Sequence, residues 1–274
     1  MAPLNSTPIV WSIAGADPSS GAGVQMDLKV MHALNTYPCS VLAGLTAQNT
    51  QGVKKAEAVA PSFLLQQIQA LQEDLPPVVI KTGMLASAEN IQIVADFLAE
   101  KKVPVVCDPI RAASSGTAFL NSEARDVLIH SLLPQITLLT PNLPELEWLL
   151  GEKIEQVERA AEKIIQMGVN AVLIKGGHSN GKVCRDYWTD GQNACWLSSP
   201  RIGEGEIHGT GCMLSSAIAA FFAQGKTWFD AVVWTKSFLN QCIKESFSLG
   251  KGARLLKISS FRNEKNNFPE IQYT

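Results

Sequence analysis

The chain has 274 residues, 46% of them hydrophobic and 18% charged, which is enough to bury the core of one α/β domain. Lys and Arg number 23 against 25 Asp and Glu, and the formal net charge of -2 excludes a strong general attraction to nucleic acid or to a membrane surface. The six cysteines include no C-x-x-C pair and no zinc-type cluster with His, which argues against a disulfide framework and a structural metal. We therefore expect a single domain over residues 1–274 that acts on a small partner.

The N-terminal segment lacks the features of an export signal. Residues 1–8 are polar, with neither a basic region nor an apolar core. No stretch of the chain reaches the ~18 consecutive apolar residues of a membrane span. We expect a cytoplasmic protein, and a reducing cytoplasm suits the scattered cysteines.

Short apolar runs alternate with amphipathic stretches from the N-terminus to about residue 175. The apolar runs predict strands at 9–14, 39–47, 78–80, 103–107, 136–139 and 171–174. The stretches between them predict helices at 24–34, 61–71, 89–100, 122–132 and 157–167. This alternation predicts right-handed βαβ units and a mostly parallel sheet.

The remainder of the chain has a different pattern. Two strand-like runs, 182–188 and 194–197, are joined by a segment that contains Asp190-Gly191. An Asp-Gly pair is typical of a β-hairpin, so we expect an antiparallel addition at one edge of the sheet. An amphipathic helix is predicted at 228–247, and the change of composition after Gly250 predicts a loosely packed end.

A glycine-containing loop opens directly into a helical run of small residues. Gly209, Thr210 and Gly211 precede Cys212 and the helix that we expect to follow it. A helix N-terminus presents unpaired backbone N–H groups and the positive end of the helix dipole, while glycine allows a ligand to approach the backbone closely. These features suit phosphate binding, although a tight turn before a buried helix explains the same residues equally well.

Three other motifs lack the context that they need. Residues 225–227 read Gly-Lys-Thr, but they follow a helix and Ala220 stands where a P-loop requires glycine, so we expect a helix-ending glycine. The 177–181 segment matches the G-x-S-x-G nucleophile elbow, but residues 183–188 are strand-like rather than helical, which argues against a hydrolase. The loop at 15–23 lacks the third glycine of a dinucleotide fingerprint.

Polar side chains follow four predicted strands: Gln48, Asp108, the pair Asn142 and Glu145, and Lys175. The carboxyl ends of parallel strands meet at one rim, so we expect these side chains to converge. Asp108 and Glu145 carry oxygen ligands that suit Mg²⁺, and Lys175 can neutralise phosphate charge. Together with the glycine loop they meet the needs of phosphoryl transfer. Singly, Asp108 is also explained as a turn cap, Glu145 as part of a first helical turn and Lys175 as a solvated cation.

Segments in this order resemble the hydroxymethylpyrimidine and phosphomethylpyrimidine kinases of thiamine biosynthesis, members of the ribokinase-like superfamily. The resemblance spans residues 9–247 and rests on GADPSSGAG at 15–23, TAQNT at 46–50, KTGM at 81–84, DP at 108–109, TPNLPE at 140–145, KGGH at 175–178 and HGTGC at 208–212. It implies a three-layer α/β/α fold whose mostly parallel central sheet has a small antiparallel edge. It also implies ATP with Mg²⁺ and two successive phosphorylations, first of the hydroxymethyl group of 4-amino-5-hydroxymethyl-2-methylpyrimidine and then of its monophosphate.

By position, the resemblance places Gln48 on the pyrimidine. A primary amide offers an acceptor beside a donor, which matches an exocyclic amino group next to a ring nitrogen. The resemblance further implies that Gly15, Asp17 and Met84 line the same pocket.

The resemblance also implies a nucleotide and metal side of the site. Asn142 and Glu145 would organise Mg²⁺ and the phosphates with Asp108 nearby, so that Asp108 and Glu145 are the expected metal ligands. Lys175 would reach the nucleotide phosphates and assist catalysis.

At the reacting end, Gly209, Thr210 and Gly211 would form an anion hole. Many ribokinase-like relatives have aspartate as the base where this chain has Cys212. A helix N-terminus lowers the pKa of a thiol, and a dissociative transition state demands little early deprotonation. We therefore expect Cys212 to assist as a modest proton acceptor.

The chain departs from the family pattern at Arg111 to Ser114, at Met213, at 203–206 and at 250–255. Arg111 either recognises the monophosphate or is a surface residue, and Met213 fits a repacked helix face. Two alternatives to the pyrimidine kinase stay open, namely a pyridoxal kinase and a non-catalytic pyrimidine sensor. The expected partners are the small pyrimidine and ATP, with neither nucleic acid nor membrane, and a homodimer stays open.

Overall fold

Ten strands of the chain form one sheet in a computed structural model, which describes residues 7–113, 116–177, 181–203, 205 and 207–274. The strand order is β12-β9-β8-β7-β6-β5-β4-β1-β2-β3. Six neighbouring strands are parallel: β2 (Tyr37–Asn49), β1 (Ile9–Gly15), β4 (Val79–Thr82), β5 (Val105–Cys107), β6 (Leu138–Leu139) and β7 (Ala171–Ile174). Most of these strands read as continuous apolar runs because helices cover both of their faces.

Antiparallel strands complete the sheet at both edges. They are β3 (Gly52–Ala58) beside β2, and β8 (Val183–Thr189), β9 (Ala194–Pro200) and β12 (Glu270–Tyr273) beyond β7. The hairpin predicted around Asp190-Gly191 is confirmed by the β8–β9 pair. A separate two-stranded parallel sheet joins β10 (Ile207–His208) to β11 (Arg254–Leu255).

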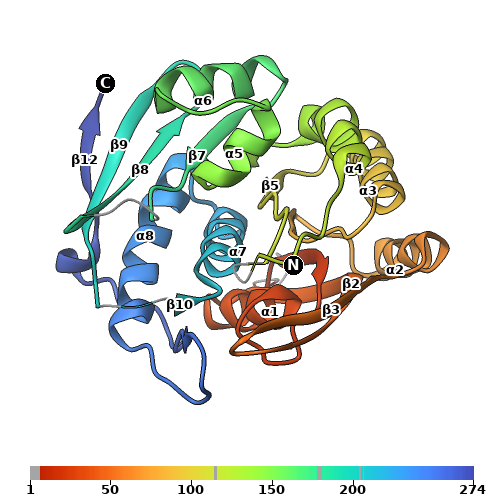
Figure 1. The fold of residues 1–274 in the computed structure, drawn as a ribbon, viewed down its shortest axis with the longest axis horizontal. Coiled ribbons are helices and arrows are strands. Elements are labelled where there is room, and N and C mark those ends of the chain that lie inside the picture. Colours follow the sequence, from red (N-terminus) through yellow and green to blue (C-terminus); the bar gives the residue numbers. More distant parts are fainter. Residues whose placement is uncertain (1–6, 114–115, 178–180, 204, 206) are drawn as a thin grey trace, which may run out of the picture.

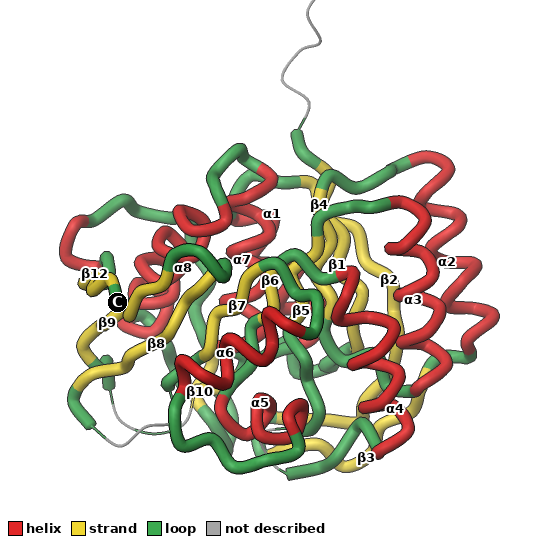
Figure 2. Tube along the Cα trace, turned by 90° about the horizontal axis from the view of Figure 1, so that it is seen from above, coloured by secondary structure: helices red, strands yellow, loops and turns green. Residues whose placement is uncertain are grey.

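Helices cover the two faces of the sheet, as Figures 1 and 2 show. One face carries α1 (Gly23–Ala33), α7 (Thr210–Ala223) and α8 (Trp228–Lys244). The other carries α2 (Pro61–Asp74), α3 (Ala88–Lys101), α4 (Ser122–Val127), the π-helix Leu128–Leu132, the 3₁₀ turn Leu133–Gln135, α5 (Leu143–Leu150) and α6 (Val157–Gln166). The three-layer α/β/α architecture expected from the sequence is therefore confirmed.

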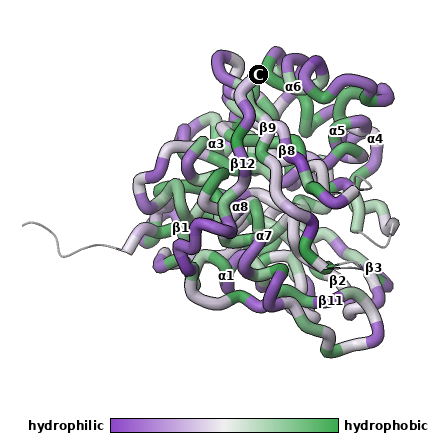
Figure 3. Tube along the Cα trace, turned by 90° about the vertical axis from the view of Figure 1, so that its left-hand side faces the viewer, coloured by the Kyte–Doolittle hydropathy of each residue, from purple (hydrophilic) through white to green (hydrophobic). Residues whose placement is uncertain are grey.

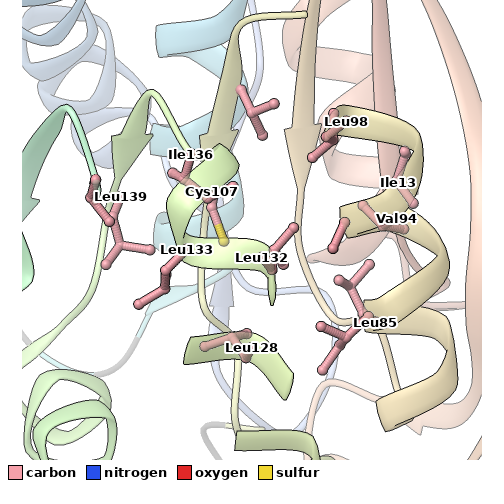
Figure 4. Close-up of a cluster of buried hydrophobic side chains, with 14 of the residues drawn as sticks. Ile13, Leu85, Val94, Leu98, Cys107, Leu128, Leu132, Leu133, Ile136 and Leu139 are labelled. Atoms are coloured by element: carbon pink, nitrogen blue, oxygen red, sulfur yellow. The ribbon is translucent and has the colours of Figure 1, made fainter. Parts of the chain in front are cut away.

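Alternation along the strands divides the core into two layers. In β1, Trp11 and Ile13 pack on the side of α2 to α6, while Val10 packs with α1, α7 and α8. Figure 4 shows the first of these layers, where Ile13, Cys107 and their neighbours meet α3 and the π-helix. In Figure 3 the hydrophobic stretches run through the interior and the hydrophilic ones lie mainly on the periphery.

Three local predictions need correction. Strand β2 extends beyond 39–47 and pairs with β3, an element that the polar sequence Gly52–Ala58 did not indicate, because an edge strand with one exposed face needs few apolar residues. The helical span predicted at 122–132 is present, but its α-helix ends at Val127 and continues as a π-helix.

The third correction concerns the C-terminal end. It was predicted to pack loosely after Gly250, yet Leu256 is buried in the core and Asn267 is only 1% exposed. The segment also supplies β11 and the edge strand β12, whose backbone bonds to β9 explain its order despite a polar sequence.

Two motif arguments agree with the structure. Gly225 follows α7 with a φ of +89°, and Thr227 is the N-cap of α8, so this Gly-Lys-Thr segment joins two helices and is no P-loop. Residues 178–180 of the G-x-S-x-G match lie outside the described residues, but β8 begins at Val183 where a nucleophile elbow needs a helix. None of the helices in the described part of the chain is long and apolar enough to cross a membrane.

Candidate active site

A cavity of about 890 Å³ lies at the carboxyl ends of the parallel strands. Each of the site residues singled out from the sequence lines it: Gly15, Asp17, Gln48, Met84, Asp108, Asn142, Glu145, Lys175, Gly209, Thr210, Gly211 and Cys212. Open α/β sheets bind ligands at this end, because loops after adjacent strands converge there. The structure therefore brings together residues that are far apart along the chain.

The N-terminus of α7 forms part of the cavity wall. Gly209 is the N-cap with a φ of +83° and has no side-chain capping bond, so the first turn keeps its N–H groups free of such a cap. A Cβ on Gly209 would lie 1.8 Å from the carbonyl oxygen of Gly21, and only glycine fits there. The loop is thus a helix N-terminus pressed against the segment before α1, and its geometry suits an anion.

An ion pair lies beside this turn. Lys175, directly after β7, places Nζ 2.7 Å from Asp108 Oδ1 and 3.7 Å from Glu145 Oε2. Burial by itself would lower the pKa of Lys175, but the carboxylates of Asp108 and Glu145 outweigh it and raise that pKa. Lys175 therefore carries a full positive charge in the cavity.

Glu145 is tied into the first turn of α5. The side chain of Asn142 accepts from the backbone N–H of Glu145, and Glu145 Oε2 accepts from the N–H of Asn142, both at 2.8 Å. This capping box explains why the loop sequence ends in Asn-Leu-Pro-Glu. Burial raises the pKa of the Glu145 carboxyl to about 7, the Asp108 carboxylate adds to the rise, and Lys175 opposes it.

The opposite end of the cavity has an apolar floor and one amide. A Cβ on Gly15 would lie 2.1 Å from the Met84 methyl carbon, and a Cβ on Gly44 would lie 2.8 Å from it, so Met84 covers both glycines. Gln48, at the end of β2, is half-buried above this floor. A flat ring has room to lie over Met84 with its edge toward the Gln48 amide.

Asp17 lines the cavity, but its carboxylate serves the protein itself. Oδ1 accepts from the N–H and the hydroxyl of Ser19, while Oδ2 accepts from the N–H groups of Gly21 and Ala22. His208 Nε2 lies 3.0 Å from Oδ2. Burial by itself would raise the pKa of Asp17, but the bonds from His208 and Ser19 hold that pKa below its usual value. The carboxylate thus shapes the loop before α1.

The expectation of a lowered thiol pKa at Cys212 is wrong. Cys212 lies in the first turn of α7, but its side chain is buried and 6% exposed. Burial raises the pKa of this thiol to about 12, and the Lys81 ammonium opposes the rise only in part. In this case desolvation outweighs the helix dipole.

A buried ion pair that the sequence reasoning missed supports the centre of the site. Lys81 Nζ lies 2.7 Å from Asp27 Oδ2, and both side chains are 0% exposed. Ser12 and Ser216 donate to the same carboxylate. The pair links β4 to α1, β1 and α7, and Lys81 also lines the cavity. The available signal was Asp27 on the apolar face of a predicted helix, three residues after Val24.

A second missed pair lines the far end of the cavity. Lys236 of α8 lies 2.6 Å from Asp186 Oδ2, and the N–H of Gly176 donates to Oδ1. Lys236 was not apparent from the sequence because it stands between the polar residues Thr235 and Ser237 of an amphipathic helix, where a lysine is expected to be solvated. Leu239 adds apolar surface to this end.

Two residues that depart from the expected family pattern have different surroundings. Arg111 lines the cavity, is exposed, and holds its guanidinium carbon 6.0 Å from the centroid of the Trp148 ring. Met213 is fully buried in the core between α7 and the sheet. The change at Met213 therefore concerns helix packing, whereas Arg111 is available to a ligand.

The family model and the sequence relatives agree on one family. A family model described as phosphomethylpyrimidine kinase matches residues 17–257. A hydroxymethylpyrimidine/phosphomethylpyrimidine kinase from Streptomyces coelicolor is 39% identical over 253 residues, which cover 91% of this chain and 94% of that protein. The structure of a phosphomethylpyrimidine kinase from Clostridium difficile 630 has a TM-score of 0.76 and 36% identity, covering 87% of this chain and 100% of that one. The pyridoxal kinase from Staphylococcus aureus in complex with AMP-PCP and pyridoxal has a TM-score of 0.86 and 27% identity, covering 98% of this chain and 99% of that one.

Proposed function

Since the chain belongs to the phosphomethylpyrimidine kinase family, we propose that it transfers the γ-phosphoryl group of ATP to the hydroxymethyl group of 4-amino-5-hydroxymethyl-2-methylpyrimidine. A second transfer, to the monophosphate formed in the first, yields the diphosphate. The observation that carries this proposal is one cavity with an amide over an apolar floor at one end and a helix N-terminus beside a lysine in its wall.

The substrate end suits a small aromatic alcohol. The pyrimidine lies over Met84 and Gly15, with its amino group and ring nitrogen toward Gln48. Its hydroxymethyl group then points to the turn at Gly209 to Gly211. The N–H groups of this turn and the Lys175 ammonium stabilise charge on the transferred phosphoryl group.

The chemical step makes one bond and breaks one. The hydroxymethyl oxygen forms a bond to the γ-phosphorus as the bond from that phosphorus to the departing ADP oxygen breaks. The hydroxyl proton leaves late and passes to a non-bridging oxygen of the transferred phosphoryl group, in keeping with a loose transition state. Because burial raises the pKa of Cys212 to about 12, its thiol is protonated at neutral pH and acts as a small polar neighbour of the hydroxyl.

The acidic residues fit a magnesium ion that is shared with the nucleotide. Asp108 and Glu145 both lie within 4 Å of the same lysine nitrogen, and carboxylate oxygens are the ligands that Mg²⁺ prefers. The described residues contain no group of three or more His, Cys, Asp or Glu that could hold a metal by themselves. Water and phosphate oxygens must therefore complete the coordination, as is usual for Mg²⁺. When bound, Mg²⁺ neutralises charge on the phosphates.

The nucleotide end lies around α5 and β8. Asn142, Lys175 and the Lys236–Asp186 pair are among the polar groups on its walls, and Leu239 gives it an apolar patch for a base. Arg111, whose guanidinium lies over Trp148 of α5, lines the same cavity as a cation without an ion-pair partner in the described part of the chain, and it suits the phosphate of the second substrate.

A steady-state assay tests the proposal. The purified protein with ATP, Mg²⁺ and the pyrimidine alcohol should release ADP, and the monophosphate should also be a substrate. Folded protein that binds the alcohol but releases no ADP would contradict the kinase and favour a pyrimidine sensor.

A pyridoxal kinase activity is the second candidate. Its support is the likeness to the Staphylococcus aureus pyridoxal kinase over 98% of this chain, together with the hydroxymethyl group that pyridoxal also carries. Competition between the two alcohols for one enzyme separates the candidates, because the better substrate has the higher kcat/KM.

A further inference from the structure

His208 joins the two segments that form the substrate end of the cavity. It lies in β10, directly before Gly209, and its ring nitrogen Nε2 is 3.0 Å from Asp17 Oδ2 and 2.9 Å from the amide atom assigned as Gln48 Nε2. These partners are 191 and 160 residues away along the chain. The ring also packs on Gly21, where a Cβ would lie 2.3 Å from its Cδ2 atom. His208 is thus held between the loop before α1 and the end of β2.

The proton on His208 follows from its partner Asp17. The bonds that hold the pKa of Asp17 below its usual value keep this side chain ionised, and an ionised carboxylate can only accept. His208 Nε2 must therefore carry a hydrogen, and this one hydrogen is shared between Asp17 Oδ2 and the Gln48 amide as a three-centre bond. A ring nitrogen that carries a hydrogen has no lone pair left in the ring plane, so it cannot accept a hydrogen bond from Gln48.

The Thr46 hydroxyl determines which atom lies at the other end of the Gln48 amide. This hydroxyl donates to the carbonyl oxygen of Ala16 at 2.9 Å, and the same hydroxyl oxygen lies 3.2 Å from the amide atom assigned as Gln48 Oε1. A hydroxyl has only one hydrogen, so toward Gln48 it can only accept. The two conditions together require the amide to be turned by 180° from its assigned orientation, so that the NH₂ group lies beside Thr46 and the carbonyl oxygen lies beside His208. Nitrogen and oxygen of an amide are assigned by such a network.

We propose that His208 is a positioning residue that, with Thr46, holds the Gln48 amide with its oxygen toward the anion loop (Gly209 to Gly211) and its nitrogen away from it. This orientation determines which ring the cavity accepts. The proposal deepens the kinase function above and rests on it.

The orientation matches one ligand chemistry. One lone pair of Gln48 Oε1 and one hydrogen of Nε2 stay free for a ligand, with the acceptor on the His208 side. When the hydroxymethyl group of an alcohol enters the anion loop, the substituent on the neighbouring ring atom faces the Gln48 carbonyl oxygen. The ring atom after that one faces the Gln48 NH₂ group. A 4-amino group followed by a ring nitrogen satisfies both. Pyridoxal offers an aldehyde oxygen or a C–H group beside its hydroxymethyl group, and so loses at least one of the two bonds.

A pair of variants separates orientation from packing. His208→Leu removes the donor and frees the amide to turn, so the Kd of the pyrimidine alcohol should rise about tenfold or more, while the Kd of AMP-PCP stays within about twofold. The preference in kcat/KM for the pyrimidine alcohol over pyridoxal should fall by a similar factor. His208→Gln keeps an N–H donor and should restore most of the preference. His130→Leu, at an exposed helix position, is the control and should change neither constant.

A double-mutant cycle measures the coupling. In a Gln48→Leu background, His208→Leu should cause no further loss of alcohol affinity, because its effect passes through the amide. Thr46→Val should weaken alcohol binding in the same way and should also be silent in that background. Additive losses, with unchanged melting temperatures, would overturn the positioning role.

The hydrogen on His208 gives a readout that does not depend on activity. Long-range ¹H–¹⁵N spectra of ¹⁵N-histidine protein, assigned by comparison with His208→Gln, should show Nε2 protonated, and a bare Nε2 would overturn the proposal. The two proposals fail separately. Wild-type protein that releases no ADP with the alcohol would contradict the kinase function, whereas normal turnover with an additive cycle would contradict only the role of His208.

Discussion

Lys175 and Asp108 form an ion pair, Nζ to Oδ1 at 2.7 Å, directly against the first turn of α7. A Cβ built on Gly211 would lie 3.2 Å from Asp108 Oδ2 and 3.3 Å from Lys175 Nζ. The anion loop and this charge pair are therefore one unit, in which the glycine brings the helix N-terminus close to a lysine and a carboxylate.

Lys175→Met should lower kcat by about 100-fold or more, because it removes a positive charge that faces the transferred phosphoryl group. The Kd of the pyrimidine alcohol, measured by calorimetry, should stay within about twofold, since Lys175 contacts Asp108 and Glu145 rather than Gln48. Lys163→Met, which breaks an exposed pair with Glu152, is the matched control and should leave both constants unchanged. A Lys175→Met enzyme with normal kcat would contradict this role.

Gln48→Leu should raise the Kd of the pyrimidine alcohol about 10- to 100-fold, because it removes an acceptor and a donor that face the ring. Calorimetry with AMP-PCP should show a nucleotide Kd within about twofold of wild type. Equal loss of both affinities would show that Gln48 supports the whole cavity instead of the pyrimidine end.

Cys212→Ala should lower kcat by about tenfold or less, whereas loss of a working general base costs about 10²- to 10⁴-fold. The reason is that burial raises the pKa of the thiol to about 12 and leaves it protonated. Iodoacetamide should therefore modify Cys212 at pH 8 much more slowly than it modifies free cysteine, as followed by mass spectrometry. Rapid modification would contradict the raised pKa and support Cys212 as the general base. A pH profile of activity with an apparent pKa near 7 in wild type that is absent in Cys212→Ala would do the same.

Lys81→Met should destabilise the fold by about 3–5 kcal/mol, because the fully buried Asp27 carboxylate loses its cation. The double variant Lys81→Met, Asp27→Asn should recover much of this loss, since the amide is neutral and still reaches Ser12 and Ser216. Urea unfolding gives both free energies. A single variant within about 1 kcal/mol of wild type would mean that the pair contributes little.

Glu145 makes a pH-dependent contribution to stability. Burial raises its pKa to about 7 in the folded protein from an ordinary value of 4.5, so between these values the folded chain binds more protons than the unfolded chain. Its stabilising contribution is then complete below about pH 4.5 and is lost as the pH rises through 7. As the pH rises from 4.5 to 8 without metal or nucleotide, the unfolding free energy of Glu145→Gln should increase relative to that of wild type by about 1–3 kcal/mol. A constant difference between the two unfolding free energies would contradict the raised pKa.

Much of the fold follows from the sequence because its signals are local. Apolar runs separated by amphipathic stretches specify strands and helices, and the handedness of βαβ units then leaves few ways to arrange them. The same rule predicts that Asp108 and Lys175 meet, since each directly follows a parallel strand. Strand β3 and the C-terminal strand β12 escape this reasoning, because edge strands are ordered by backbone bonds to a neighbour and need little apolar sequence of their own.

Three features of the site were decided only by the tertiary structure. The Asp27–Lys81 pair joins residues 54 apart, and His208 meets Asp17 across 191 positions, distances over which no local pattern specifies a contact. The pKa of Cys212 depends on how much solvent the packed layers exclude, and this burial reverses the effect expected from a helix N-terminus. By itself the sequence determined which chemical groups reach the rim of the sheet. Packing decided which of them are charged, which partners they contact and which way they face, because these properties depend on desolvation and on contacts between distant segments.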